Sequence, residues 1–444
     1  MTAFSSTLTR LPDGRGQDAR PDIPVYVWLM LAGLVATMFS GHMAELGVPV
    51  PVDRLLIAAA ALLLLLDPAR ERLRWRSFYL VAGLTVIWTA LSWVSNGSVT
   101  DVTKLFALTD RVLIPLLMFP LGALIFTTAR RRELGLRTLS LLGIYLGITG
   151  FFEYLRIYAF VFPSYIANYA DPNGDAVAAG PWTSKEPFGM VSALALFASI
   201  LLARTTTSTL WRWISHLGAI GGLVGSVLCM TRTVWLAVPA TGLIVALLQP
   251  KLRRKLPLLI LAGVALGAAF LFAFPEFRDA LLTRLLTERS VYDRQNTNAA
   301  ALRIIAALPL FGIGWGEFIN QNLLWVRQAD TYPVTNVTIE VHNVFLSRAA
   351  ETGVLGAVLW VLCFATGPLL GLLAQPRTRE AMQWKLLGLG AFLVWIIPSL
   401  SSPNPYPTPN LLIWLIWGVA ARGILVDLPT PVERVRAEPP APAA

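Results

Sequence analysis

The segment PLFGIGWGEF, residues 309–318, lies inside the one long polar interruption of a chain that is otherwise almost continuously apolar. The interruption runs from Phe274 to Leu355, and long apolar runs precede and follow it. A membrane-spanning helix needs about 20 mostly apolar residues, whereas a transmembrane barrel would show shorter segments of alternating polarity. The sequence therefore predicts an all-α integral membrane protein with one large loop outside the bilayer.

The composition agrees with a membrane protein. Hydrophobic residues make up 55% of the chain and charged residues 14%, whereas an ordinary soluble domain carries about 25% charged residues. The formal net charge of +10 does not call for a nucleic-acid partner, because membrane proteins concentrate Lys and Arg in their cytoplasmic loops. Cys229 and Cys363 both lie in apolar runs, which favours buried thiols over a disulfide or a metal cluster.

Twelve apolar runs are predicted to span the membrane. Lys and Arg cluster in alternate loops, as at 70–76 and 251–255, while the short loops at 41–52 and 401–410 contain neither. Because cytoplasmic loops are enriched in Lys and Arg, this alternation places both termini in the cytoplasm and the polar interruption on the outer side. The predicted runs lie at about 24–40, 51–66, 78–95, 111–128, 136–152, 188–203, 213–230, 233–249, 257–274, 345–373, 384–401 and 411–426.

The domain organisation follows from these runs. Residues 1–23 and 428–444 are expected to be disordered cytoplasmic tails, and no small-residue cleavage site follows the first apolar run, so a signal peptide is not expected. The first nine spans occupy residues 24–274, the large outer loop residues 275–344, and the last three spans residues 345–427.

The large loop is predicted to contain two helices, at 276–289 and about 294–308, the second of which ends at Pro309. The glycines at 312, 314 and 316 lack the preceding strand and the following Lys-Ser/Thr of a nucleotide-binding loop. They are expected instead to form a tight turn that folds the loop back on itself.

Two further outer segments contain polar residues next to apolar runs. Residues 96–110 are expected to form a short interfacial helix before a span that begins at Arg111. The segment 151–187 is rich in aromatic residues and carries Lys185 and Glu186. Its aromatic residues suit either an ordinary membrane-interface belt or a platform for sugar or lipid.

Arg232 lies between Thr231 and Thr233, with apolar runs on both sides and almost no loop between them. An arginine there is costly if it faces lipid, so it is expected to face a cavity or to reach the headgroups. Arg348 and Glu351 stand three apart on the tenth predicted span and are expected to pair for structural reasons.

Three stretches of the chain resemble the family of O-antigen ligases and related lipid-linked polysaccharide polymerases. His342-Asn343, nine residues and then Gly353-Val354-Leu355-Gly356 match the family's spacing from His to Gly-x-x-Gly. Arg294 stands fifteen residues before Pro309, which begins a match to the family's Pro-Leu-Phe-Gly segment, and Thr231-Arg232 is similar to its Ser-Arg at the outer end of a span. The family's aromatic residue shortly after the loop arginine is absent, so Arg303 and Arg289 remain alternatives to Arg294.

The resemblance implies a GT-C-like, metal-independent glycosyltransferase at the periplasmic face of the cell inner membrane. Such a ligase transfers O-antigen from undecaprenyl diphosphate to the lipid A core in lipopolysaccharide biosynthesis. A lipid-linked polysaccharide polymerase and a protein O-oligosaccharyltransferase share the motifs and remain open. The expected partners are the lipid-linked donor, lipid A core or another glycan acceptor, and membrane lipid. A transporter would show inverted repeats and charges in mid-span, and the sequence shows no such repeat.

The resemblance assigns catalysis to Arg232, Arg294 and His342. Arginine grips phosphate oxygens with paired hydrogen bonds and suits a leaving diphosphate. Histidine titrates near neutral pH, so His342 is expected to be a base or orienter of the acceptor hydroxyl, or else a diphosphate ligand or a structural residue. No cofactor or metal is expected, since His42 and His216 are the other histidines and no cysteine or carboxylate cluster accompanies them. Residues expected to bind substrate are Lys185, Arg289, Arg303 and Asn343.

Overall fold

The structure is a computed structural model that describes residues 23–48, 50–95, 100–169, 177–286, 289–321, 324–327, 339–376 and 378–426, without the side chains at 284, 285, 289 and 290. The predicted tails at 1–23 and 428–444 lie outside these residues, apart from Ile23.

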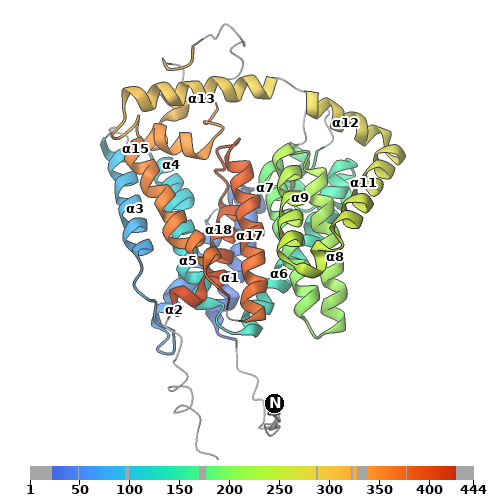
Figure 1. The fold of residues 1–444 in the computed structure, drawn as a ribbon. Coiled ribbons are helices and arrows are strands. Elements are labelled where there is room, and N and C mark those ends of the chain that lie inside the picture. The colour runs from blue at the N-terminus through green and yellow to red at the C-terminus, as the bar shows by residue number, and fades with distance from the viewer. Residues whose placement is uncertain are drawn as a thin grey trace, which may run out of the picture.

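The described residues form a bundle of helices with further helices across one end (Figure 1). Helix α13 lies over that end, and α12 continues from it towards the edge of the bundle, where α11 stands. The helices are α1 (Val25–Ala36), α2 (Val52–Leu66), α3 (Ser77–Ser95), α4 (Val102–Leu108), α5 (Ile114–Ile125), α6 (Ala129–Tyr154), α7 (Lys185–Thr205), α8 (Thr209–Leu228), α9 (Arg232–Leu248), α10 (Pro250–Arg253), α11 (Leu256–Ala273), α12 (Pro275–Leu286), α13 (Arg289–Ala307), α14 (Phe318–Gln321), α15 (Val344–Phe364), α16 (Leu370–Leu373), α17 (Arg379–Ser399), α18 (Pro407–Ala420) and α19 (Arg422–Leu425).

All twelve predicted apolar runs coincide with helices of the structure. Eight helical segments of the described chain are long and apolar enough to cross a membrane, and α9 and α18 are shorter apolar helices. The all-α membrane class is therefore confirmed, whereas the number of twelve spans stays a prediction. The eight segments are Val25–His42, Ser77–Ser95, Val102–Ile125, Ala129–Tyr154, Lys185–Thr205, Leu256–Ala273, Val344–Leu373 and Arg379–Ser399.

The structure differs from the sequence-based expectation at 96–110. Helix α4 continues into α5 through a π-helical turn at Thr109–Leu113, so Val102–Ile125 forms one helical segment instead of an interfacial helix followed by a span. Pro115, in the first turn of α5, has no N–H to donate, so the regular α-helical bond to the preceding turn is missing where the π-helical turn lies.

Helices α6, α7 and α8 pack closely because glycines line their contacts. A Cβ atom on Gly143 or Gly147 would collide with the backbone of α8 at Gly218 or Gly221. Small residues let membrane helices approach until their backbones touch, which gains dispersion energy that lipid cannot replace. This packing fixes the first residues of α7 and the last turn of α8 at one end of the bundle.

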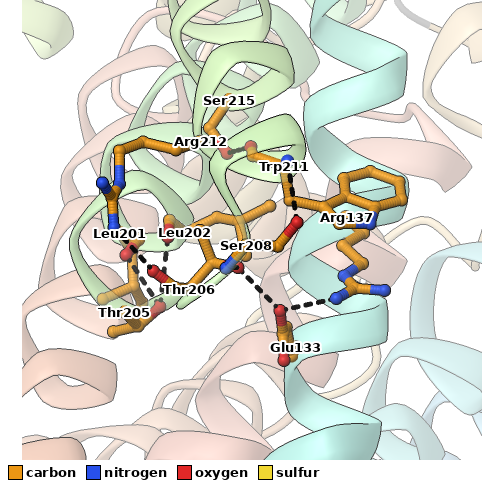
Figure 2. Close-up of polar contacts among 10 residues, drawn as sticks. All are labelled: Glu133, Arg137, Leu201, Leu202, Thr205, Thr206, Ser208, Trp211, Arg212 and Ser215. Atoms are coloured by element: carbon orange, nitrogen blue, oxygen red, sulfur yellow. Dashed lines mark hydrogen bonds and ion pairs between the residues drawn. The ribbon is translucent and has the colours of Figure 1, made fainter.

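The opposite end of the same helices is joined by a polar network (Figure 2). The Glu133 carboxylate accepts hydrogen bonds from the Arg137 guanidinium at 2.8 Å and from the Thr206 hydroxyl at 3.0 Å. The Arg137 guanidinium also lies 4.5 Å from the ring centre of Trp211, a favourable cation–π contact. The short α7–α8 connection is thereby held against α6.

The glycine turn after α13 is confirmed, and it attaches this helix to α15. Gly312, Gly314 and Gly316 all have positive φ angles. The Ile313 N–H donates to the Ala350 carbonyl at 2.9 Å, and the Gly314 N–H donates to the Glu351 carbonyl at 3.1 Å. The Val354 N–H donates back to the Pro309 carbonyl at 2.8 Å, which α15 permits because it is kinked at Gly353.

Replacing Gly353 with Ala is expected to destabilise the protein by roughly 2–4 kcal/mol. Gly353 has φ 73° and ψ 174°, a backbone conformation that is essentially restricted to glycine. An added Cβ would also collide with the Leu310 carbonyl. Thermal unfolding of the detergent-purified variant measures the loss. The matched control is Gly263→Ala on α11, where a Cβ meets nothing within 4 Å; equal melting shifts in the two variants would refute this account.

Candidate active site

Arg232 begins α9 at the end of the bundle that α13 covers. Helix α8 ends at Leu228, and the chain reverses through Met230, which has a φ of 48°. Thr231 is the N-cap residue, so Arg232 occupies the first helical position and its side chain is half-buried. The predicted tight turn is confirmed.

Arg294 lies on α13 with its side chain half-buried. Burial lowers the pKa of Arg294, the Glu186 carboxylate opposes this effect, and the positive charge of Arg232 adds to it. The guanidinium remains charged at any physiological pH. Arg294 and Arg232 are thus close enough to repel each other, which makes their shared surroundings favourable for an anion.

His342 stands two residues before α15, and its ring has a defined hydrogen-bond partner. Its Nδ1 lies 3.0 Å from the Glu340 carbonyl oxygen. A carbonyl can only accept, so Nδ1 carries the proton and Nε2 keeps a lone pair. Burial lowers the pKa of His342, and Arg294 lowers it further. The neutral imidazole therefore prevails at neutral pH and can accept a proton through Nε2.

The three residues of the predicted catalytic set are linked electrostatically through Arg294. The charge of Arg232 acts on Arg294, and the charge of Arg294 acts on His342. They come from the start of α9, the first half of α13 and the segment before α15. Helix α13, which carries Arg294, lies across the end of the bundle (Figure 1).

Glu186, Ser402 and Tyr406, which were not among the predicted site residues, complete this region. The Glu186 carboxylate accepts a hydrogen bond from Ser402 at 2.7 Å, and it also interacts with the Tyr406 hydroxyl and the Arg294 charge. Lys185, the first residue of α7, acts electrostatically on Glu186 as well. The sequence does show a proline-rich turn at 401–407 and a Lys-Glu pair at the start of an apolar run. It does not show that the turn contacts this pair, because that contact depends on tertiary packing.

The other residues expected to bind substrate are placed differently. Arg303 lies nine residues after Arg294 on the same helix, which is two and a half turns, so the two side chains leave opposite faces. The Arg303 guanidinium donates to the Trp325 carbonyl at 2.8 Å. The side-chain oxygen of Asn343 caps α15 by accepting a hydrogen bond from the Phe345 N–H at 2.9 Å. The side-chain NH₂ group of Asn343 donates to the Leu400 carbonyl at 3.3 Å. The side chain of Arg289 lies outside the described part of the structure.

Buried ion pairs support the segment that carries His342. Arg111 pairs with Glu340 at 2.9 Å, two residues before the histidine. Arg348 and Glu351 lie 3.7 Å apart, which confirms the predicted pair, and the Arg348 guanidinium is 4.6 Å from the Trp315 ring centre. Lys104 and Glu317 pair beside the glycine turn. The Arg348–Glu351 and Lys104–Glu317 pairs are buried and the Arg111–Glu340 pair is partly buried. Removing one partner of a buried pair would leave an uncompensated charge.

Lys185, Arg232 and Arg294 contribute three positive charges to this region, beside the acidic side chains of Glu186 and Asp293. A partly buried cluster of Lys185, Arg232 and Arg294 suits a phosphate-bearing ligand, and a neutral histidine beside it suits transfer of a proton from a hydroxyl. Across the described residues, no three His, Cys, Asp or Glu side chains are grouped so that they could hold a metal ion.

Residues 217–361 match the family model described as O-antigen ligase. The exopolysaccharide production protein ExoQ of Rhizobium meliloti (strain 1021) is 25% identical over 313 residues, which cover 64% of this chain and 67% of that protein. The matched family segment includes Arg232, Arg294 and His342, whereas Lys185, Glu186 and Ser402 lie outside it. Residues 217–361 are thus similar to the O-antigen ligase family that the three sequence motifs resemble.

Proposed function

We propose that this protein is a membrane glycosyltransferase that moves a glycan from undecaprenyl diphosphate to a hydroxyl group of an acceptor glycan. The observation that carries the proposal is the electrostatic link between Arg232, Arg294 and His342, which come from three separate segments of the chain. The match of residues 217–361 to the family model described as O-antigen ligase supports it.

The proposed topology has twelve spans, both termini in the cytoplasm and the α13 side at the periplasmic face of the inner membrane. The α2–α3 connection, which contains four arginines between residues 70 and 76, lies at the bundle end opposite α13 (Figure 1). Excess Lys and Arg marks the cytoplasmic side, so this placement supports a periplasmic cap. Helices α12 and α13 then belong to the large periplasmic loop at 275–344.

Arg232 and Arg294 are proposed to bind the diphosphate of the donor. As the bond between the anomeric carbon and the phosphate oxygen breaks, negative charge develops on the leaving diphosphate. Two guanidinium groups fixed beside it stabilise that charge without reorganising, which contributes several kcal/mol in well-studied enzymes. Lys185 extends the same positive surface from the start of α7.

His342 is proposed to receive the proton of the acceptor hydroxyl. The acceptor oxygen forms a bond to the anomeric carbon, the proton passes to Nε2, and undecaprenyl diphosphate leaves with the electron pair of the broken bond. The hydrogen bond from Nδ1 to the Glu340 carbonyl keeps Nε2 available for this role. A neutral histidine is required, in agreement with the lowered pKa of His342.

The preferred acceptor is the lipid A core oligosaccharide, which makes the protein an O-antigen ligase of lipopolysaccharide biosynthesis. A polymerase that extends a lipid-linked polysaccharide is the second candidate. The name of the related ExoQ, an exopolysaccharide production protein, favours this second candidate. Both reactions use the same donor and the same proposed residues, and they differ in the acceptor.

Reconstitution with competing acceptors tests the proposal. Purified protein in lipid nanodiscs is offered a defined undecaprenyl-diphosphate glycan together with lipid A core, lipid-linked repeat and a protein acceptor. Glycan on the lipid A core is the expected product, and longer lipid-linked chains would identify a polymerase. Activity is expected to persist in a chelator. Transfer to none of the three acceptors would contradict a glycosyltransferase.

A further inference from the structure

Two consecutive residues of the π-helical turn at Thr109–Leu113 form ion pairs with different parts of the chain. The Asp110 carboxylate accepts a hydrogen bond from the Arg54 Nε at 2.9 Å and a second one from Nη2 of the same guanidinium. Arg111 pairs with the Glu340 carboxylate at 2.9 Å. The π-helical turn therefore links the first turn of α2 to the segment before α15.

The link to α2 is made by an arginine whose own position is well defined. The Arg54 guanidinium donates to the Ser40 hydroxyl at 3.3 Å and lies 5.6 Å from the centre of the Phe106 ring. Its two parallel bonds to Asp110 are of the bidentate kind that fixes both partners in one geometry. Consecutive helical residues point in directions about 100° apart, so Asp110 can hold the turn while Arg111 reaches residue 340.

The peptide group between Glu340 and Val341 carries the oxygen that accepts the Nδ1 proton of His342. The side chains on both sides of this peptide group are held in place. Arg111 holds Glu340, and Val341 is fully buried in a hydrophobic cluster with residues of α13. Since φ and ψ are the soft torsions of the backbone, releasing Glu340 would let the peptide oxygen turn away from Nδ1.

The direction of this oxygen decides which nitrogen of the His342 ring carries the proton. While Nδ1 donates to the oxygen at 3.0 Å, Nε2 keeps its lone pair. Without that acceptor the ring can place its proton on either nitrogen. The form with the proton on Nε2 cannot take up the proton of an acceptor hydroxyl there, so only the Nδ1–H form suits the role proposed for His342.

We propose that Arg111 is a positioning residue for His342, which holds the ring in its Nδ1–H form through the ion pair with Glu340. The proposal rests on the proposed function, because it takes His342 to be the proton acceptor. This role requires no contact between Arg111 and the substrate. The Arg54–Asp110 pair keeps Arg111 in place by fixing the turn that carries it.

Nitrogen NMR on the full-length protein in nanodiscs, labelled at histidine, measures the tautomer directly. The chain contains three histidines, so His42→Gln and His216→Gln assign the signals of the other two. The natural protein is expected to show His342 protonated at Nδ1. In Arg111→Met the ratio of the Nδ1–H form to the Nε2–H form is expected to fall about fivefold, the effect of losing one hydrogen bond.

Single-turnover transfer at saturating donor shows whether the tautomer matters for the reaction. At a pH where His342 is neutral, Arg111→Met is expected to slow transfer about fivefold and to leave the affinity for the donor within about twofold. Arg111→Lys keeps the charge and should recover most of the rate. A weaker affinity for the donor with an unchanged rate at saturation would make Arg111 a binding residue and would overturn the proposal.

Glu340→Ala breaks the same ion pair from the other side and separates orientation from charge. The charged groups that act on His342 are Arg294 and Asp293 of α13 and Glu340 itself, whose negative charge favours a higher pKa of the histidine. Glu340→Ala should therefore shift the rising limb of the pH profile to lower pH. Arg111→Met leaves the carboxylate unpaired and should shift this limb to higher pH. Both variants should lower the plateau rate, because both release the peptide oxygen.

Arg132→Met is the matched control. Arg132 lies in the first turn of α6 and pairs with Glu380 at 2.7 Å at the opposite end of the bundle. Its replacement should lower the thermal stability of the protein while leaving the tautomer of His342 and the rate of transfer unchanged. If Arg111→Met fails to fold, Glu340→Ala decides alone, since it breaks the same pair at a partly exposed residue.

The outcomes separate this inference from the proposed function. The positioning role is overturned if Glu340→Ala and Arg111→Met keep His342 protonated at Nδ1, or if they shift the proton without slowing transfer. If His342→Gln transfers glycan at the natural rate, the base assigned by the proposed function is wrong, whatever the tautomer. A shifted tautomer together with a slower plateau in both variants supports the role of Arg111.

Discussion

Replacing His342 with Gln is expected to slow glycan transfer by a factor of about 10² to 10⁴, the contribution of a positioned proton acceptor. Glutamine can still donate a hydrogen bond to the Glu340 carbonyl, so the segment before α15 should keep its position. It cannot accept a proton at neutral pH. Single-turnover transfer from a lipid-linked donor measures the loss, and donor binding should persist.

The pH dependence of the transfer rate is a second test of the role of His342. The protonated imidazole cannot act as a base, so the rate is expected to rise with pH and to level off once His342 is neutral. Burial and Arg294 lower its pKa from the ordinary value of 6.5, so the rising limb should lie below pH 6.5. The matched control is His216→Gln on α8, an exposed histidine, which should leave rate and profile unchanged. A His342→Gln variant that transfers glycan at the natural rate would remove His342 from the mechanism.

Replacing Arg294 with Ala is expected to reduce transfer by a factor of about 10² to 10³, the usual cost of removing a fixed stabiliser of developing negative charge. Arg294→Lys should recover part of the rate, because an ammonium group supplies the charge without the planar fork that grips two phosphate oxygens. The comparison is made with donor at saturation and below it, which separates binding from the chemical step.

Arg303→Ala is the matched control, because Arg303 lies on the opposite face of the same helix and bonds the Trp325 carbonyl. It should lower the thermal stability of the loop region while leaving the rate of transfer nearly unchanged. Equal losses of activity in the Arg294 and Arg303 variants would show that the whole of α13, and not one guanidinium, is what the reaction needs.

Features encoded by local chemistry could be predicted from the sequence. The apolar runs became helices, Arg232 lies in the expected turn, and the glycines after Pro309 fold the loop back as expected. Arg348 and Glu351 are three residues apart on one helix, so their pairing needed no knowledge of the tertiary structure. The number of spans could not be settled in this way, because α2, α8, α9 and α18 are not among the eight helical segments that are long and apolar enough to cross a membrane.

Contacts between residues far apart in the sequence could not be predicted. Glu186 and Ser402 are 216 residues apart, and no local pattern marks their hydrogen bond. Asn343 stood beside the matched histidine, which suggested a substrate contact, yet both ends of its side chain bond to the backbone. Asparagine is a preferred N-cap residue, so the capping role of Asn343 could have been predicted from the sequence.

The attachment of α13 to α15 through main-chain hydrogen bonds has an evolutionary consequence. Every amino acid except proline offers the same backbone donor and acceptor, so this attachment demands glycine at a few points and little from the remaining side chains. The surface of the cap can diverge between relatives while the arginine on α13 stays above the same point of the bundle. Under the proposed function, a lineage built on this attachment can change the sugars that it recognises without moving the charges proposed to bind the phosphates.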